Sequence, residues 1–195
     1  MNYSQTAERL AEYRRQIQTL RQEMRQVQAE VEPEPVVDYR FHTLEGEVAL
    51  SELFGGKPEL FVIHNMGKGC SACTLWADGF NGVLPHLENR AAFVVSSPDD
   101  PETQQALKVA RGWRFRMVSH QGSSFAADMG YLSESGHWQP GVSVFRKTAN
   151  GIVRLSDTGF HENDDFCTPW RLFDMLPEGP NGWRPKFDYY KEVVA

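Results

Sequence analysis

The first 32 residues carry apolar side chains at alternating spacings of three and four, and Arg, Gln and Glu fill most positions between them; the apolar residues are Leu10, Tyr13, Ile17, Leu20, Met24, Val27 and Val31. This period is typical of a helix with one narrow apolar seam. Pro33 and Pro35 follow, and prolines remove backbone donors and push the preceding residue into extended geometry. We therefore expect a separate helical arm over residues 1–32 and a linker over residues 33–38.

The seam of this arm has two interpretations. It could lie on the rest of its own chain, or it could pair with a partner helix. The repeat runs for about three heptads, which is near the lower limit for a coiled coil. The pattern favours pairing, and we expect a homodimer through the N-terminal helix.

After the linker, segments with strand character alternate with segments of helical period. The strand segments are residues 39–44, 48–50, 59–66, 92–96, 115–119, 142–147 and 152–155, and the helical ones are 51–54, 73–87, 101–111 and 169–176. Gly79, Gly82 and Pro85 predict a kink or break in the second helical segment. Alternation of this kind predicts crossover units around a mainly parallel sheet, which a hairpin at Asn150-Gly151 makes mixed. The expected fold class is α/β, over one domain at residues 39–195.

Composition and charge exclude several classes of protein. The chain has 195 residues, 41% of them apolar, and a net charge of −6, which argues against a dedicated nucleic-acid binder. No stretch approaches the ~20 apolar residues of a membrane span. The polar start lacks the apolar core of a signal peptide, so we expect a cytoplasmic protein. With three cysteines and a reducing compartment, a structural disulfide framework is not expected.

The motif "GKGCSAC", residues 67–73, directly follows a buried strand segment and begins a helical one. A cysteine at a helix N-terminus meets unpaired backbone N–H groups and the positive end of the helix dipole, which favour the thiolate of Cys70. Lys68 adds a nearby cation. Cys73 lies one turn along, so the pair suits a reversible disulfide in which Cys70 attacks and Cys73 has the higher pKa. The alternative is that both are small packing residues.

Three longer stretches carry a resemblance to a known family. "YRFHTLEGEVALSELFGGKPELFVIH" resembles the opening of alkyl-hydroperoxide-reductase-like members of the thioredoxin superfamily. "GCSACTLWADGFNGVLPHLENRAAFVVSS" and "GWRFRMVSHQGSSFAADMGY" are similar to the thioredoxin-like family catalogued as domain of unknown function 899. The resemblance covers nearly the whole chain and implies a thioredoxin-like mixed sheet flanked by helices.

The chain departs from the best-known patterns of that superfamily at two places. Peroxiredoxins have Thr or Ser three residues before the attacking cysteine, where this chain has Gly67. Thioredoxins have Trp before the first cysteine and Gly-Pro between the two, where this chain has Gly69 and Ser71-Ala72.

The resemblance also implies roles for two residues outside the motif. His64 lies six residues before Cys70, where thioredoxins place a buried carboxylate that handles protons, and an imidazole could do similar work at Cys73. Pro140 stands just before a strand, where thioredoxin-like folds have a cis proline beside the cysteine pair. The alternatives are a hydrogen-bonded core histidine and an ordinary trans proline.

A metal site is the main competing interpretation of the cysteines. Cys70, Cys73, His161 and Cys167 could make a tetrahedral zinc set, but the spacing from His161 to Cys167 is not that of a usual zinc pair. We expect no metal and no other cofactor, and we interpret Cys167 as a buried small hydrophobe.

These observations predict a thiol-disulfide oxidoreductase that acts through Cys70, Cys73, His64 and Pro140 on a protein or small-molecule thiol or disulfide. Peroxide reduction and a non-catalytic binding module are the alternatives. Trp76, Phe80 and Trp170 could line a recognition surface, although aromatic core is the expected role for at least two of them.

Overall fold

A computed structural model describes residues 2–189 of the chain. The chain divides between Pro33 and Glu34 into two compact units. The first unit contains the long helix α1 (Tyr3–Ala29), none of whose residues is buried. Asn2 begins the helix with a capping box, because its side chain accepts the Gln5 N–H at 2.9 Å and the Gln5 side chain accepts the Asn2 N–H at 3.1 Å.

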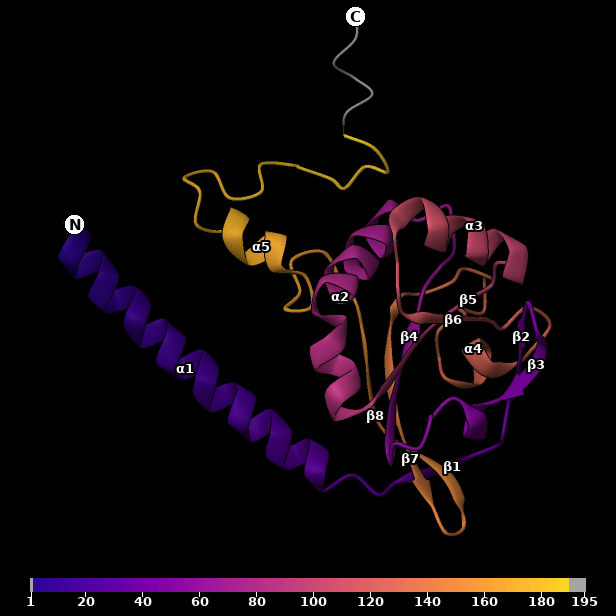
Figure 1. Ribbon diagram of the computed structural model, residues 1–195. Helices are drawn as coiled ribbons and strands as arrows, with labels where there is room; N and C mark the ends of the chain where they lie inside the picture. Colours follow the sequence, from indigo (N-terminus) through magenta and orange to yellow (C-terminus); the bar gives the residue numbers. More distant parts are fainter. Residues whose placement is uncertain (1, 190–195) are drawn as a thin grey trace, which may run out of the picture. The chain divides into compact units, whose positions relative to one another are not determined.

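The second unit is built on one eight-stranded mixed sheet with the order β1-β8-β7-β4-β5-β6-β2-β3 (Figure 1). β4, β5 and β6 pair in parallel, and β7 runs antiparallel to β4. The strands are β1 (Glu34–Val36), β2 (Arg40–Thr43), β3 (Gly46–Ala49), β4 (Glu59–His64), β5 (Ala92–Ser97), β6 (Arg116–Ser119), β7 (Gly141–Thr148) and β8 (Gly151–Gly159).

Helices connect and cover these strands: the 3-10 turn η1 (Leu50–Glu52), α2 (Ser71–Arg90), α3 (Pro101–Arg111), α4 (Phe125–Asp128) and α5 (Thr168–Phe173). The α/β architecture predicted from the sequence is confirmed, and α3 and the β7–β8 hairpin lie where the pattern placed them. The four-residue helix α4 was not predicted.

Two hydrophobic cores lie on the two faces of the sheet, because successive side chains of a strand point to opposite faces. Ile63 of β4 belongs to the core that contains α2, with Cys73 and Trp76. Val62 belongs to the opposite core, with Phe125 of α4. Figure 1 shows α2 and α4 on opposite sides of β4. This division decides which residues can meet the cysteines.

The segment 33–38, predicted as a linker, contains the short strand β1. It pairs antiparallel with β8, and Pro35 lies opposite Val153. β1 is the last strand at one edge of the sheet. A proline is tolerated there, because no further strand needs a hydrogen bond from its missing N–H. The two closely spaced prolines indicated a linker, although the segment forms an edge strand.

Helix α2 runs unbroken through Gly79, Gly82 and Pro85, where the sequence predicted a kink or break. Proline at position 85 leaves the carbonyl of Asn81 without its usual helical donor. The guanidinium of Arg114 donates to that carbonyl at 3.1 Å. A side chain from the α3–β6 connection thus takes the place of the missing backbone donor, and the sequence around Pro85 could not reveal this.

Candidate functional site

Cys70 is the N-cap residue of α2, at the carboxyl end of β4. The backbone N–H of Cys73 donates to the Cys70 sulfur, with 3.0 Å between N and Sγ. The Thr74 N–H and hydroxyl both donate to the Cys70 carbonyl at 3.1 Å. Cys70 is half-buried, whereas Cys73 is 3% exposed, and both are free thiols. The pair therefore consists of one partly exposed and one buried cysteine.

The two thiols differ strongly in acidity. The hydrogen bond with the Cys73 thiol lowers the pKa of Cys70 to about 7, with help from the backbone N–H groups of Cys73 and Ala72 and against the effect of burial. The hydrogen bond with Cys70, burial and the charge of Cys70 raise the pKa of Cys73. A thiol with a pKa near 7 is about half thiolate at neutral pH.

The loop between β4 and Cys70 is held by two side chains that the sequence analysis missed. The Gly67 N–H donates to Asn65 Oδ1 at 2.8 Å, and the Lys68 N–H donates to Asp99 Oδ2 at 2.9 Å. The Gly67 carbonyl accepts the Cys70 N–H at 3.1 Å. Asn65 and Asp99 thus fix the backbone that delivers Cys70 to the helix N-terminus.

Gly67 makes this clamp possible. Its φ is +96°, and a Cβ at this position would stand 3.0 Å from both carboxylate oxygens of Asp99. The Ser97 hydroxyl donates to the same carboxylate at 3.2 Å. Asp99 follows β5, the parallel neighbour of β4, so the contact joins residues about 30 positions apart. The sequence indicates it only in that both residues follow predicted parallel strands, whose carboxyl ends meet at one edge of the sheet.

His64 lies on the other face of the sheet from Cys73. Its ring stacks on Tyr131 with 3.7 Å between centroids and on Phe125 with 5.3 Å, and its Nε2 hydrogen-bonds Ser143 Oγ at 2.9 Å. Ile63, the preceding residue, packs in the core of Cys73. Because neighbouring residues on a strand point to opposite faces, this placement does not support the predicted proton transfer from His64 to Cys73. The hydrogen-bonded core histidine, the alternative interpretation, describes His64 better.

A second buried histidine accompanies His64. His120, after β6, bonds Ser96 Oγ through Nδ1 at 2.8 Å. Burial lowers the pKa of His120 to about 4. Burial, with smaller contributions from His120 and Arg154, holds the pKa of His64 well below its usual range. The Nδ1 of His64 and the Nε2 of His120 are buried without a hydrogen-bond partner.

Pro140 precedes β7 and has a trans peptide bond, as do all peptide bonds of residues 2–189, so the expected cis proline is corrected. Its carbonyl accepts the Phe160 N–H at 2.8 Å, which extends the β7–β8 pairing by one step. Gly141 pairs with His64, so Pro140 does stand at the end of β4 from which the cysteine loop leaves. A trans bond is the intrinsically favoured isomer, and here the extended ladder accommodates it.

The residues of the alternative zinc set are not assembled. Within the described part of the chain, no three or more His, Cys, Asp or Glu side chains are arranged to hold a metal ion. The His161 ring packs beside Gly159, and Cys167 is buried at the start of α5. Burial and the charge of Asp164 raise the pKa of Cys167 to about 11, which fits a packing role.

The three aromatic residues considered for recognition are mostly core. Trp76 and Trp170 are buried, and Phe80 is half-buried. The Trp76 indole N–H donates to Asp164 Oδ1 at 3.3 Å.

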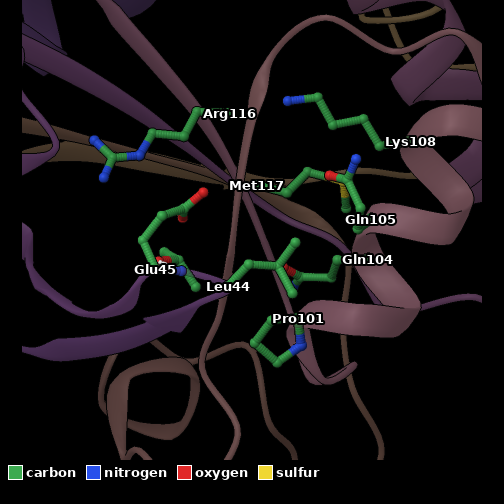
Figure 2. A pocket seen from close by; sticks show the side chains of 9 residues that line it. Leu44, Glu45, Pro101, Gln104, Gln105, Lys108, Arg116 and Met117 are labelled. Carbon is green, nitrogen blue, oxygen red and sulfur yellow. Dashed lines mark hydrogen bonds between the residues drawn. The ribbon is translucent and has the colours of Figure 1, made fainter.

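A surface pocket of about 250 Å³ lies apart from the cysteines, between the β2–β3 turn, α3 and β6 (Figure 2). Glu45, Lys108 and Arg116 are among the residues that line it. Its side chains include neither Cys70 nor Cys73, so it is not part of the candidate site.

None of the helices formed by residues 2–189 has the length and apolar character needed to cross a membrane.

Solved structures with the same fold include peroxiredoxins. Reduced Prx3 of Vibrio vulnificus in complex with hydrogen peroxide gives a TM-score of 0.53 at 16% identity, over 68% of this chain and 88% of that chain. Peroxidoxin BcpB of Mycobacterium tuberculosis gives 0.53 at 19% identity, over 65% and 84%. Reduced 2-Cys peroxiredoxin of Plasmodium vivax gives 0.51 at 17% identity, over 67% and 84%. This likeness shows a thioredoxin-like fold.

No curated protein matches the sequence. A family match, in contrast, extends over residues 4–193, which is nearly the whole chain. It agrees with the resemblance carried by the motif stretches and with the thioredoxin-like fold. The chain therefore belongs to the family described as "Bacterial protein of unknown function (DUF899)".

Proposed function

We propose that the protein is a thiol-disulfide oxidoreductase in which Cys70 is the attacking sulfur and Cys73 the resolving one. The observation that carries this proposal is the hydrogen bond from the Cys73 N–H to Cys70 Sγ at the start of α2. A donor fixed on the sulfur stabilises the thiolate, which is the nucleophilic form. The exposure of the two residues fits the same roles, since Cys70 is partly exposed and Cys73 is buried.

The reaction needs only sulfur chemistry. The Cys70 thiolate attacks one sulfur of a substrate disulfide, forms a mixed disulfide and releases the other sulfur as a thiolate. Cys73 then loses its proton to solvent or to the departing thiolate and attacks Cys70. The substrate leaves as its second thiolate, and the Cys70–Cys73 disulfide holds the oxidised state. Two electrons pass to the substrate, and a dithiol reductant restores the pair by the reverse steps.

The proposed setting is the cytoplasm, with a protein or small-molecule disulfide as the substrate. A reducing compartment supplies the thiols that return the pair to its reduced state. The exposed residues Lys68 and Gly69 border the partly exposed Cys70, so a substrate disulfide would approach from this side. No metal or organic cofactor enters the proposed reaction, because the two sulfurs carry both electrons.

Trapping of the intermediate tests the proposal. In the Cys73→Ser variant, oxidised glutathione should leave a stable mixed disulfide on Cys70, because no resolving thiol remains. The wild-type chain should instead give a Cys70–Cys73 disulfide. Peptide mass spectrometry identifies both products.

Two further variants serve as controls. Cys167→Ser should behave like the wild type, and Cys70→Ser should give no adduct at position 73. An adduct on Cys167 alone, or none in any variant, would favour a non-catalytic binding module. Hydrogen peroxide provides a further comparison, since oxidation of Cys70 by peroxide much faster than by the disulfide would favour peroxide reduction.

A further inference from the structure

The helix α1 presents an uninterrupted apolar seam to its surroundings. Its six seam residues, and Val31 just beyond its end, are between 45% and 68% exposed; the six are Leu10, Tyr13, Ile17, Leu20, Met24 and Val27. Most of the remaining positions of α1 are polar or charged, so the seam is the one continuous apolar surface of this helix. A single helix of this kind gains most of its stability from packing its apolar face.

From this seam we infer that α1 pairs with α1 of a second copy of the chain, and that the two helices run antiparallel. In heptad terms, Leu10, Ile17 and Met24 occupy a positions, and Tyr13, Leu20 and Val27 occupy d positions. An antiparallel pair places each a residue opposite a d residue. One register does this along the whole helix: Leu10 meets Val27, Tyr13 meets Met24, and Ile17 meets Leu20 of the other copy. The seam is therefore complementary to itself.

The charges beside the seam decide the direction. In the antiparallel register the flanking g positions face each other, so Arg9 lies near Glu30 of the second copy, twice per dimer. The e positions bring Arg14 near Arg21, also twice per dimer, so attractive and repulsive pairs are about balanced in this direction. In a parallel pair, a g residue instead faces the e residue five positions on. Arg9 would then face Arg14, and neither flank would hold an opposite-charge pair.

Contacts within α1 are compatible with this pairing. The Arg9 guanidinium lies over the Tyr13 ring, 5.8 Å from its centroid, and its Nε donates to the Tyr13 hydroxyl at 3.2 Å. Arg9 is thereby held beside the seam. The ion pair of Arg15 with Glu12 lies on the outer positions c and f, where it does not compete with the partner helix.

Charge reversal tests direction and partner together. The full-length Arg9→Glu variant should weaken an antiparallel dimer on the order of three- to thirtyfold in Kd, because Glu would face Glu30 twice. Glu30→Arg should weaken it by a similar factor, and the double variant should restore it. Sedimentation equilibrium measures Kd for each protein. The double variant also controls for the lost Arg9–Tyr13 contact, which both proteins with Glu at position 9 lack.

A parallel dimer would respond differently to these substitutions. Arg9→Glu would then tighten the dimer through Arg14, and Glu30→Arg would leave it unchanged, which overturns the proposed direction. The Ile17→Asp/Leu20→Asp variant should dissociate the dimer, whereas Gln18→Asp/Gln22→Asp, with the same charge on the outer face, should not. A wild-type chain that sediments as a monomer, or a seam variant that stays dimeric, overturns the pairing itself.

Discussion

At the scale of single residues, hydrogen bonds to the Cys70 sulfur and the burial of Cys73 distinguish the two cysteines. The Cys73 N–H donates to the Cys70 sulfur, so negative charge is stabilised at Cys70, while Cys73 is buried beneath it. The same local geometry therefore gives the pair a nucleophile and a reserve thiol. Their difference in pKa follows first from the hydrogen bond between the two thiols, which favours the thiolate at Cys70 and disfavours it at Cys73, and then from the deeper burial of Cys73 and the backbone N–H groups beside Cys70.

The acidity of Cys70 predicts its alkylation by iodoacetamide. The rate at Cys70 should rise with pH to a midpoint near its pKa of about 7, because only the thiolate reacts. Cys73 should react much more slowly at every pH from 6 to 8, since its pKa is raised and it is buried. Peptide mass spectrometry after timed quenching gives both rates. Equal, slow rates at the two positions would contradict the assignment.

Asp99 should matter through the loop that it holds. Asp99→Ala removes the acceptor of the Lys68 N–H, so the loop that holds Cys70 at the start of α2 should loosen. The Cys70 thiolate should then lose part of its backbone hydrogen bonding, and the midpoint of its alkylation should move to higher pH. The free energy of unfolding should fall by roughly 1–3 kcal/mol. Asp99→Asn keeps an acceptor oxygen, so its alkylation midpoint and its free energy of unfolding should stay close to those of the wild type.

The matched control for Asp99→Ala is Glu47→Ala, at an exposed position of β3. It should change neither the alkylation midpoint of Cys70 nor the free energy of unfolding. An unchanged alkylation profile in Asp99→Ala would show that the carboxylate does not position Cys70.

The cysteine motif could be predicted from the sequence because its geometry is local. Cys70 follows a strand and Cys73 lies three residues further on a helix, so the N-cap position and the order of acidity follow from spacing alone. Asn65 and Asp99 could not be assigned, since their partners are backbone N–H groups of a loop whose path depends on tertiary structure.

At the scale of elements, the face of each strand decides what its side chains can do. β4 reads as a continuous apolar run because both of its faces are covered, and such a run does not reveal which residues share a face. His64 was placed correctly on a buried strand, yet its side chain enters the core of Phe125 rather than that of Cys73. Pro140 was likewise placed at the right strand end, but its peptide bond is trans and not cis.

The two histidines at these strand ends predict how stability depends on pH. Both pKa values are lowered in the folded protein, to about 4 for His120, whereas the unfolded chain takes up these protons near pH 6.5. The stabilisation is therefore complete above pH 6.5 and is lost as pH falls toward 4. Each histidine should contribute about 1 kcal/mol of lost stability per pH unit in that window.

Urea unfolding at several pH values between 7.5 and 4.5 measures this dependence. The His120→Gln variant should show a shallower slope than the wild type, and the exposed His86→Gln should match the wild type. Parallel curves for wild type and His120→Gln would contradict the prediction.

At the scale of the whole molecule, the chain combines a thioredoxin-like unit with a helical one. The family and the fold class followed from long motif stretches and from the alternation of strands and helices, and both are confirmed. The seam of α1 was evident because its period is strictly regular. β1 was not, since three residues with a central proline carry no strand pattern and become a strand only by pairing with β8.

The contact of Gly67 with Asp99 also constrains how this sequence can change. Peroxiredoxins carry Thr or Ser at the position that Gly67 occupies, three residues before the attacking cysteine. A Cβ there would stand 3.0 Å from both Asp99 carboxylate oxygens, so the carboxylate would have to shift by a few tenths of an ångström, and the residue would have to adopt a φ of +96°, which is strained for any residue with a Cβ. A Gly67→Thr or Gly67→Ser substitution alone should therefore strain the loop between β4 and α2 and disturb the contact with Asp99. Because positions 67 and 99 are in direct contact, the effects of substitutions at the two should depend on each other rather than add, for an evolving lineage as for a designer.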